Sequence, residues 1–160
     1  MDKLGFMFAI FGAALAAILP GIGSAKAVGF VGEAGAGLLS EDTSMFGKVL
    51  VLQFLPGTQG LYGFLTAFLL LNRIGIIGGT VPEVFTWSQG LLYLCAALPI
   101  ALTGYFSALY QGRVAASGVG LLAKKSDQLA KAMTMAALVE TYAILTLLVS
   151  ILAVFSIGKV

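Results

Sequence analysis

LVETYAIL (residues 138–145) lies inside AMTMAALVETYAILTLLVSILAVFSIG (132–158), an apolar run of 27 residues whose only charge is Glu140. Lys131 and Lys159 flank the run. The run is longer than the roughly 20 residues that an α-helix needs to cross the hydrocarbon core of a bilayer. It has no polar face that would keep Glu140 in water, so the sequence predicts a membrane-spanning helix. Because a carboxyl group at that depth is costly unless a neighbour neutralises it, Glu140 is the first candidate functional residue.

The composition of the whole chain also indicates a membrane protein. Of its 160 residues, 59% are hydrophobic and 10% are charged, and the mean hydropathy is +1.03, which is too apolar for a soluble domain of this size. The chain has no histidine, the commonest metal ligand and general base. A net charge of +2 with scattered basic residues argues against nucleic acid as a partner. The single cysteine, Cys95, excludes an intrachain disulfide and is expected to be a small core residue.

Four apolar segments, which we expect to form helices 1 to 4 in chain order, are each long enough to span the bilayer: about 4–39, 46–72, 84–122 and 129–158. The connections between them are short and rich in charge, glycine, proline or serine, as turns are: 39–48, 72–88 and 121–131. Short connections place consecutive helices side by side and antiparallel. We therefore predict an all-α membrane protein, a single domain over residues 1–160, made of two helical hairpins with both termini on one side.

The second hairpin repeats the first at a constant offset of 83 residues, without a gap. The matched pairs cross two helices and a loop, and they include Gly21/Gly104, Ser24/Ser107, Gly29/Gly112, Gly35/Gly118, Lys48/Lys131 and Thr58/Thr141. The sequence therefore predicts a duplicated hairpin, with one copy at about 4–72 and the other at about 84–158. Two helices separate the copies, so the repeats are parallel, unlike those of an inverted-repeat transporter. AKA (25–27) has the form of a signal-peptide cleavage site. Because helix 1 has a counterpart in mid-chain, we expect that it is part of the folded protein and is not cleaved off.

Only the second copy carries the carboxyl group, because Glu140 aligns with Gly57 of the first copy. The first copy contains LPGTQGLYG (55–63) instead. Pro56 has no N–H to donate to the carbonyl of Leu52, and its ring disturbs the same turn, so we expect a break in this membrane helix. Backbone carbonyl oxygens released by such a break can turn towards a ligand.

Several polar side chains are predicted to lie at the depth of Glu140. Counted from the turns at 39–48 and 121–131, at about 1.5 Å per residue, Gln59, Gln111 and Glu140 lie within a few ångströms of one level. A lone glutamine or threonine in a membrane helix more often bonds to a neighbouring helix. Here a carboxylate, two amides, the Thr58 hydroxyl and a loosened carbonyl share one depth. Five oxygens, one of them anionic, suit a hard monovalent cation better than catalytic chemistry.

Helices 1 and 3 each carry a stripe of small residues at spacings of three or four. The stripe of helix 1 contains Ala14, Ala17, Gly21, Ala25, Gly29, Gly32 and Ala36, and that of helix 3 contains Ala97, Ala101, Gly104, Ala108, Gly112 and Ala115. Such stripes let helix backbones approach closely in lipid. They fit either a tight four-helix monomer or an inner ring of many copies, and parallel repeats favour the ring. Lys26 and Glu33 lie on one face of helix 1, where we expect an ion pair within or between copies.

Four stretches resemble a known family: PGIGSAKAVGFVGEAGAG (20–37), LQFLPGTQGLYGFLTAFL (52–69), YQGRVAASGV (110–119) and MAALVETYAIL (135–145). They are similar to the membrane rotor subunit (the proteolipid, also called the K or c subunit) of bacterial sodium-translocating V-type ATPases, and the similarity covers nearly the whole chain. The resemblance implies a homo-oligomeric ring of four-helix subunits in the bacterial plasma membrane. Helices 1 and 3 would form the inside of the ring, and helices 2 and 4 the outside, in contact with the lipid bilayer.

The same resemblance implies an ion site and partners. It places the sodium ligands at the Leu55 backbone carbonyl, Thr58, Gln59, Gln111 and Glu140, with Tyr62 hydrogen-bonded to the glutamate. The implied partners are a stator membrane subunit with an arginine, central-stalk subunits, and a separate soluble sector that hydrolyses ATP. One departure is Arg113, which stands where the family usually has lysine.

We therefore expect a non-catalytic subunit that binds Na⁺ at Glu140 and carries it past the stator during ATP-driven rotation. The sequence has no G-x-x-x-x-G-K-[ST] loop, so ATP must be bound elsewhere. Three alternatives stay open: the same rotor carrying H⁺, which also competes for the site; a small proton-coupled antiporter; and a four-span structural protein. The antiporter fits poorly with parallel duplication and an acid on the last helix only. The structural protein leaves the shared depth of Gln59, Gln111 and Glu140 unexplained.

Overall fold

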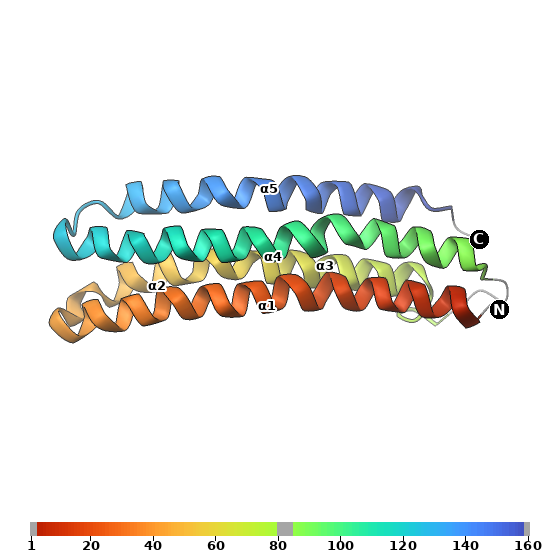
Figure 1. The fold of residues 1–160 in the computed structure, drawn as a ribbon, viewed down its shortest axis with the longest axis horizontal. Coiled ribbons are helices and arrows are strands. Elements are labelled where there is room, and N and C mark those ends of the chain that lie inside the picture. Colours follow the sequence, from red (N-terminus) through yellow and green to blue (C-terminus); the bar gives the residue numbers. More distant parts are fainter. Residues whose placement is uncertain (1–2, 80–84, 159–160) are drawn as a thin grey trace.

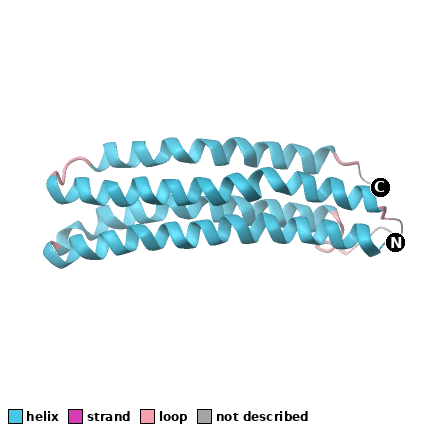
Figure 2. Ribbon diagram, viewed as in Figure 1, coloured by secondary structure: helices cyan, strands magenta, loops and turns pink. Residues whose placement is uncertain are grey.

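A computed structural model describes residues 3–79 and 85–158, and the regular structure within these ranges is helical (Figure 1, Figure 2). The elements are α1 (Lys3–Glu41), η1 (Thr43–Met45), α2 (Phe46–Phe54), η2 (Leu55–Gly57), α3 (Thr58–Arg73), α4 (Trp87–Lys124) and α5 (Leu129–Ser156). They make up four spans that are long and apolar enough to cross a membrane: α1, the run Thr43–Arg73 from η1 to α3, α4 and α5. This confirms the four predicted spans. Residues 80–84 of the predicted connection and the flanking Lys159 lie outside the described residues.

The helices form one elongated bundle, in which α1 begins and α5 ends at the same end (Figure 1). α1 packs along α4 and α3, and α4 also packs along α5. The turns that follow α1 and α4 lie at the opposite end, where the Lys48 ammonium donates to the Ser126 carbonyl at 2.7 Å. At the terminal end, the Arg73 guanidinium donates to the Phe155 carbonyl at 3.1 Å. The two predicted antiparallel hairpins are therefore present, and polar contacts tie them together at both ends.

Polar side chains cap the starts of α4 and η1 at the two ends of the bundle. Thr86 begins α4 with a reciprocal cap, in which its hydroxyl accepts from the Gln89 N–H and its own N–H donates to the Gln89 side chain. At the start of η1, Asp42 accepts from the Ser44 N–H at 2.9 Å. Hydrogen bonds from the Ser44 side chain and backbone hold the pKa of Asp42 below its usual range. These caps supply partners to N–H groups that a helix start leaves free.

α1 and α4 approach so closely that glycine is required where they touch. A Cβ at Gly112 would lie 2.6 Å from the Ala27 Cβ, and one at Gly23 would lie 2.7 Å from the Tyr105 carbonyl oxygen. The whole small-residue stripe of α4 is buried inside the chain, which corrects the expectation that it faces other copies. The stripe of α1 is half-buried or exposed, because α1 turns a second face of small residues into the bundle: Ala9, Ala13, Ala16 and Ala27.

Gly112→Ala is expected to destabilise the bundle by about 1–3 kcal/mol, because the added methyl group overpacks a backbone contact. Gly120→Ala on the same helix is the control, since a Cβ there meets nothing within 4 Å. Alanine also favours a helix over glycine, so the control is expected to be neutral or stabilising. Thermal unfolding of the purified variants in detergent measures the difference. Equal melting temperatures would show that α1 and α4 are not held this closely.

Candidate ion-binding site

Pro56 divides the second span at the level of Glu140. Leu55–Gly57 form a single 3₁₀ turn between α2 and α3, because proline has no N–H for an α-helical hydrogen bond. The Leu55 carbonyl oxygen accepts from the Thr58 N–H, and also from the Thr58 hydroxyl at 3.0 Å. The expected break is thus present, and it brings the Leu55 carbonyl and the Thr58 hydroxyl together at the start of α3.

Two glutamines connect α3, α4 and α5 at this level. Gln59 and Gln111 are both 0% exposed. The Gln59 amide nitrogen donates to the Gln111 amide oxygen, and the Gln111 amide nitrogen donates to a carboxylate oxygen of Glu140 at 3.3 Å. The structure therefore brings together three side chains that are far apart in the sequence.

Tyr62 completes the surroundings of the carboxylate. Its hydroxyl donates to the second oxygen of Glu140 at 2.6 Å, so each carboxylate oxygen accepts a hydrogen bond. The Thr58 hydroxyl lies 3.4 Å from the Gln59 amide oxygen. The polar groups thus form one continuous chain of contacts from the Leu55 carbonyl to the Tyr62 hydroxyl. Glu140 and Tyr62 are half-buried, so this chain runs from the interior of the bundle towards its surface.

Two buried serines that sequence reasoning missed support the site. Ser107 accepts from the Gln59 amide nitrogen at 3.2 Å and donates to the Val139 carbonyl at 3.1 Å. Ser24 accepts from the Gly60 N–H at 2.9 Å. The signal that could have found them is the repeat, because Ser24 and Ser107 occupy matched positions in its two copies. Each serine hydroxyl therefore reaches a neighbouring helix at the level of the site.

The other charged residues within the spans lie apart from this site. Lys26 and Glu33 are exposed on α1, and no ion pair joins them within the described ranges. The pairing expected within one copy is therefore absent. Arg113 is exposed, and its guanidinium lies 5.6 Å from the centroid of the Tyr110 ring, where a cation–π contact stabilises it. These three charges have no contact with Glu140.

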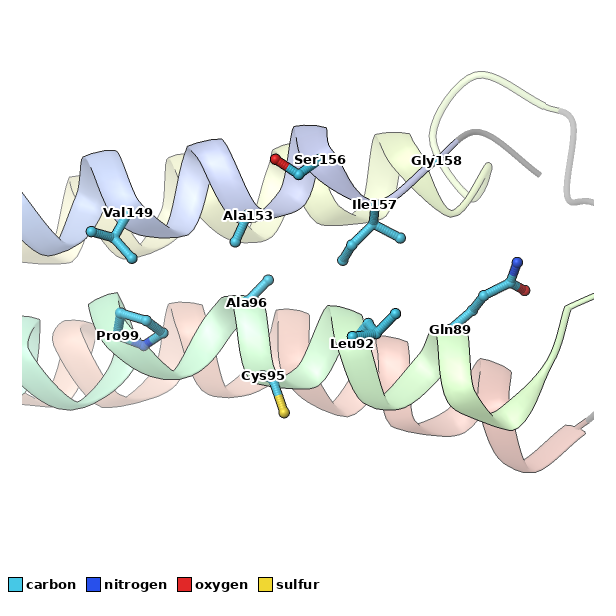
Figure 3. Close-up of a pocket in the computed structure, with 10 residues that line it drawn as sticks. All are labelled: Gln89, Leu92, Cys95, Ala96, Pro99, Val149, Ala153, Ser156, Ile157 and Gly158. Carbon is cyan, nitrogen blue, oxygen red and sulfur yellow. The ribbon is translucent and has the colours of Figure 1, made fainter.

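A groove of about 760 Å³ lies between α4 and α5 towards the terminal end of the bundle (Figure 3). Cys95 is among its lining residues and is exposed, which corrects the expectation of a core position. The reason is helical geometry: α4 turns Tyr93, Ala96 and Ala97 inward, and residue 95 falls on another face. The lining residues include no acidic group, so the groove does not extend the candidate site around Glu140.

The donor atoms around Glu140 are oxygens that a hard cation prefers. The carboxylate supplies one negative charge, and neutral oxygens come from the Gln59 and Gln111 amides, the Thr58 hydroxyl and the Leu55 carbonyl. Soft or borderline metals favour sulfur or imidazole instead. Across the described residues, no three His, Cys, Asp or Glu side chains gather around one point. A group of oxygens with this chemistry can hold a monovalent cation or a proton.

The family of ATP synthase C subunits matches the chain twice, at residues 11–70 and again at residues 94–153. The chain belongs to this family. Both ends of the second match lie 83 positions after those of the first, which is the offset of the repeat. The predicted duplication is thus confirmed. Membership in the family, together with four apolar spans, makes the chain an integral membrane subunit.

Two relatives align with the chain over both hairpins. The V-type sodium ATPase subunit K of Enterococcus hirae is 49% identical over 152 residues, which cover 95% of this chain and 93% of the relative. The A-type ATP synthase subunit K of Methanocaldococcus jannaschii is 39% identical over 148 residues, which cover 92% of this chain and 62% of the relative. One relative is thus named subunit K of a V-type sodium ATPase, and the other is named subunit K of an A-type ATP synthase.

Proposed function

We propose that this chain is the ion-carrying subunit of a rotor ring, and that it binds Na⁺ at Glu140 and carries it past a stator during ATP-driven rotation. The observation that supports this most directly is the chain of contacts that joins Glu140 to Gln111, Gln59, Thr58 and the Leu55 carbonyl. It offers one negative charge and four neutral oxygens, which suits a hard monovalent cation. The relative from Enterococcus hirae is named a sodium ATPase subunit.

Neutralisation of Glu140 is the step that permits rotation. A bare carboxylate facing lipid is costly, so each copy must hold a cation or a proton while it passes through the bilayer. Glu140 is half-buried on α5, so its carboxylate is reachable from the bundle surface. Tyr62 and Gln111 position its two oxygens by hydrogen bonds. At the stator, a fixed arginine replaces the cation for a moment, and rotation becomes ion transport in one direction.

The proposed partners follow from this cycle. Copies of the chain form a closed ring in the bacterial plasma membrane, a stator subunit supplies the arginine, and central-stalk subunits connect the ring to a soluble sector that hydrolyses ATP. The chain itself is non-catalytic, since its sequence lacks the phosphate-binding loop of such ATPases. On the small-residue stripe of α1, a Cβ at the half-buried Gly21 or the exposed Gly29 would meet nothing within 4 Å, which supports close packing of a second copy there.

Sodium is expected to protect Glu140 from hydrophobic carbodiimides, which attack the protonated carboxyl group. Bound Na⁺ keeps the carboxylate ionised and so prevents the reaction. Purified rings are treated with dicyclohexylcarbodiimide over a range of pH, with and without sodium, and the adduct is located by mass spectrometry. Protection by millimolar or lower sodium, weakening as the pH falls because protons compete for the same carboxylate, supports the proposal.

Rings that carry Glu140→Gln are the control, because they lose the group that reacts. A proton requires little beyond the carboxyl group and one hydrogen-bond acceptor, so a proton site would not use the remaining oxygens. Labelling that ignores sodium at every pH would therefore leave a rotor that carries H⁺. A monomer or dimer in detergent, in place of a large homo-oligomeric ring, would favour the antiporter.

A further inference from the structure

Inside the chain, the two hairpins meet through two different faces. Ala27 and Gln59 of the first hairpin form an insertion face, and both are 0% exposed. Gln111, Gly112 and Glu140 of the second hairpin form the receiving face. A Cβ at Gly112 would lie 2.6 Å from the Ala27 Cβ, and the Gln59 amide donates to the Gln111 amide. The interface between the hairpins is therefore heterologous, with unlike faces in contact.

The repeat gives the second hairpin a counterpart of the insertion face. Shifted by 83 positions, Ala27 and Gln59 correspond to Tyr110 and Tyr142. These two tyrosines are 56% and 67% exposed, and the neighbouring Phe106 is 53% exposed. A shallow groove of about 370 Å³ lies among the three aromatic rings. The second hairpin thus has exposed aromatic side chains at the positions where the residues of the first hairpin are fully buried.

The first hairpin has the matching counterpart of the receiving face. Shifted back by 83 positions, the receiving face of Gln111, Gly112 and Glu140 corresponds to Val28, Gly29 and Gly57. Val28 and Gly57 line an open groove of about 610 Å³ along α1, α2 and α3. A Cβ at Gly29 would meet nothing within 4 Å. One receiving face is therefore filled within the chain, and the other is open.

We propose that the two free faces bind each other in neighbouring copies, with Tyr142 of one copy inserted into the groove beside Val28 and Gly57 of the next. This proposal rests on the rotor ring of the proposed function, and it names the contact through which neighbouring copies in that ring join. Each copy has one free insertion face and one free receiving face. Copies therefore join head to tail, and such a contact closes into a ring when the rotation between copies fits.

Side-chain size fits this pairing. The offset of 83 residues converts each contact inside the chain into an expected contact between copies. The contact of Ala27 with Gly112 becomes a contact of Tyr110 with Gly29 of the next copy. The contact of Gln59 with Gln111 becomes a contact of Tyr142 with Val28 of the next copy. Gly29 leaves open space for a large aromatic side chain, and Val28 borders the groove. Aromatic side chains that fill pockets contribute strongly to association. The exposed tyrosines thus gain apolar contacts that the isolated chain does not give them.

The contact between copies differs chemically from the contact inside the chain. Gly57 and Val28 stand where the second hairpin has Glu140 and Gln111, so the lining of this groove contains no carboxylate. Tyr142 brings an aromatic ring to the position that an amide occupies inside the chain. The contact between copies therefore serves assembly, and the ion is held within each copy.

Disulfide cross-linking tests the contact. In a Cys95→Ala background, the pair Val28→Cys and Tyr142→Cys is expected to give, after oxidation in membranes, a ladder of covalent oligomers up to the full ring on a denaturing gel. Each single variant is expected to give no covalent oligomer, because unlike faces meet. The control pair is Val28→Cys with Ile144→Cys. Ile144 lies at nearly the depth of Tyr142, but about 200° around α5, so no ladder is expected.

The same two cysteines on separate coexpressed chains are expected to give covalent dimers and nothing longer, a result that does not depend on assembly of the double variant. If these dimers and the ladder were both absent while a native gel still showed a large ring, the proposed contact would be overturned, but the proposed rotor function would not. The groove would then hold lipid chains. Dimers from Tyr142→Cys alone would overturn it too, since like faces would be in contact. Absence of any ring from the unmodified chain would overturn this contact and the proposed function together.

Discussion

Replacing Glu140 with glutamine is expected to abolish ATP-driven sodium transport by the assembled ATPase while the ring still forms. Glutamine keeps the shape of the side chain and still accepts the hydrogen bond from Tyr62, so the packing of α5 is preserved. It removes the negative charge that, in the proposed cycle, binds the cation and attracts the stator arginine. Sodium uptake by reconstituted vesicles measures transport, and a native gel measures the size of the ring.

The control for this prediction is Glu33→Gln. Glu33 is also a carboxyl group within a span, but it is exposed on α1 and has no contact with the site. Its loss is expected to leave transport near the wild-type level. Wild-type transport in the Glu140 variant, with the ring assembled, would contradict the rotor assignment.

Removing one of the proposed neutral ligands is expected to weaken sodium binding about ten- to a hundredfold without dissolving the ring. Gln111→Ala removes the amide that contacts both Gln59 and Glu140. Thr58→Ala removes the hydroxyl beside the Leu55 carbonyl. An interaction with a charged centre is worth about 1.5–3 kcal/mol, which corresponds to this loss of affinity. Binding of radioactive sodium to purified rings measures the change.

Gln53→Ala provides the matched control for these variants. The Gln53 amide lies on α2 and donates to the Val28 carbonyl at 3.4 Å, away from Glu140. Its removal is expected to leave the sodium affinity unchanged. An affinity equal to wild type in both the Gln111 and Thr58 variants would mean that the oxygens at this depth do not bind the ion.

The number of spans, the break in the second span and the depth of the polar residues were all determined by the sequence alone. The length of each apolar run sets the spans, and the missing N–H of Pro56 sets the break. The common depth of Gln59, Gln111 and Glu140 follows because an α-helix rises by a constant distance per residue, and all three residues were counted from turns on the same side of the membrane. The duplication was visible because one offset holds through both hairpins, and the two family matches have the same offset.

The inward face of each helix was decided only by the tertiary structure. In a soluble protein, the apolar stripe of a helix marks its buried face. In lipid, both faces are apolar, so hydropathy does not distinguish them. For this reason the sequence predicted Cys95 in the core, whereas it is exposed. It also assigned the small-residue stripe of α4 to other copies, whereas that stripe is buried within the chain, with Gly112 against Ala27.

The side-chain partners within the site depend on the same choice of face. Ser107 bonds to Gln59 and to the Val139 carbonyl because α4 turns that serine inward, towards α3 and α5. Its depth was readable from the repeat, but its direction around the helix was not. Position along the membrane normal could be predicted from the sequence, since residues can be counted along a helix. Direction around each helix axis could be read only from the folded bundle, because it is set by how the helices pack against one another.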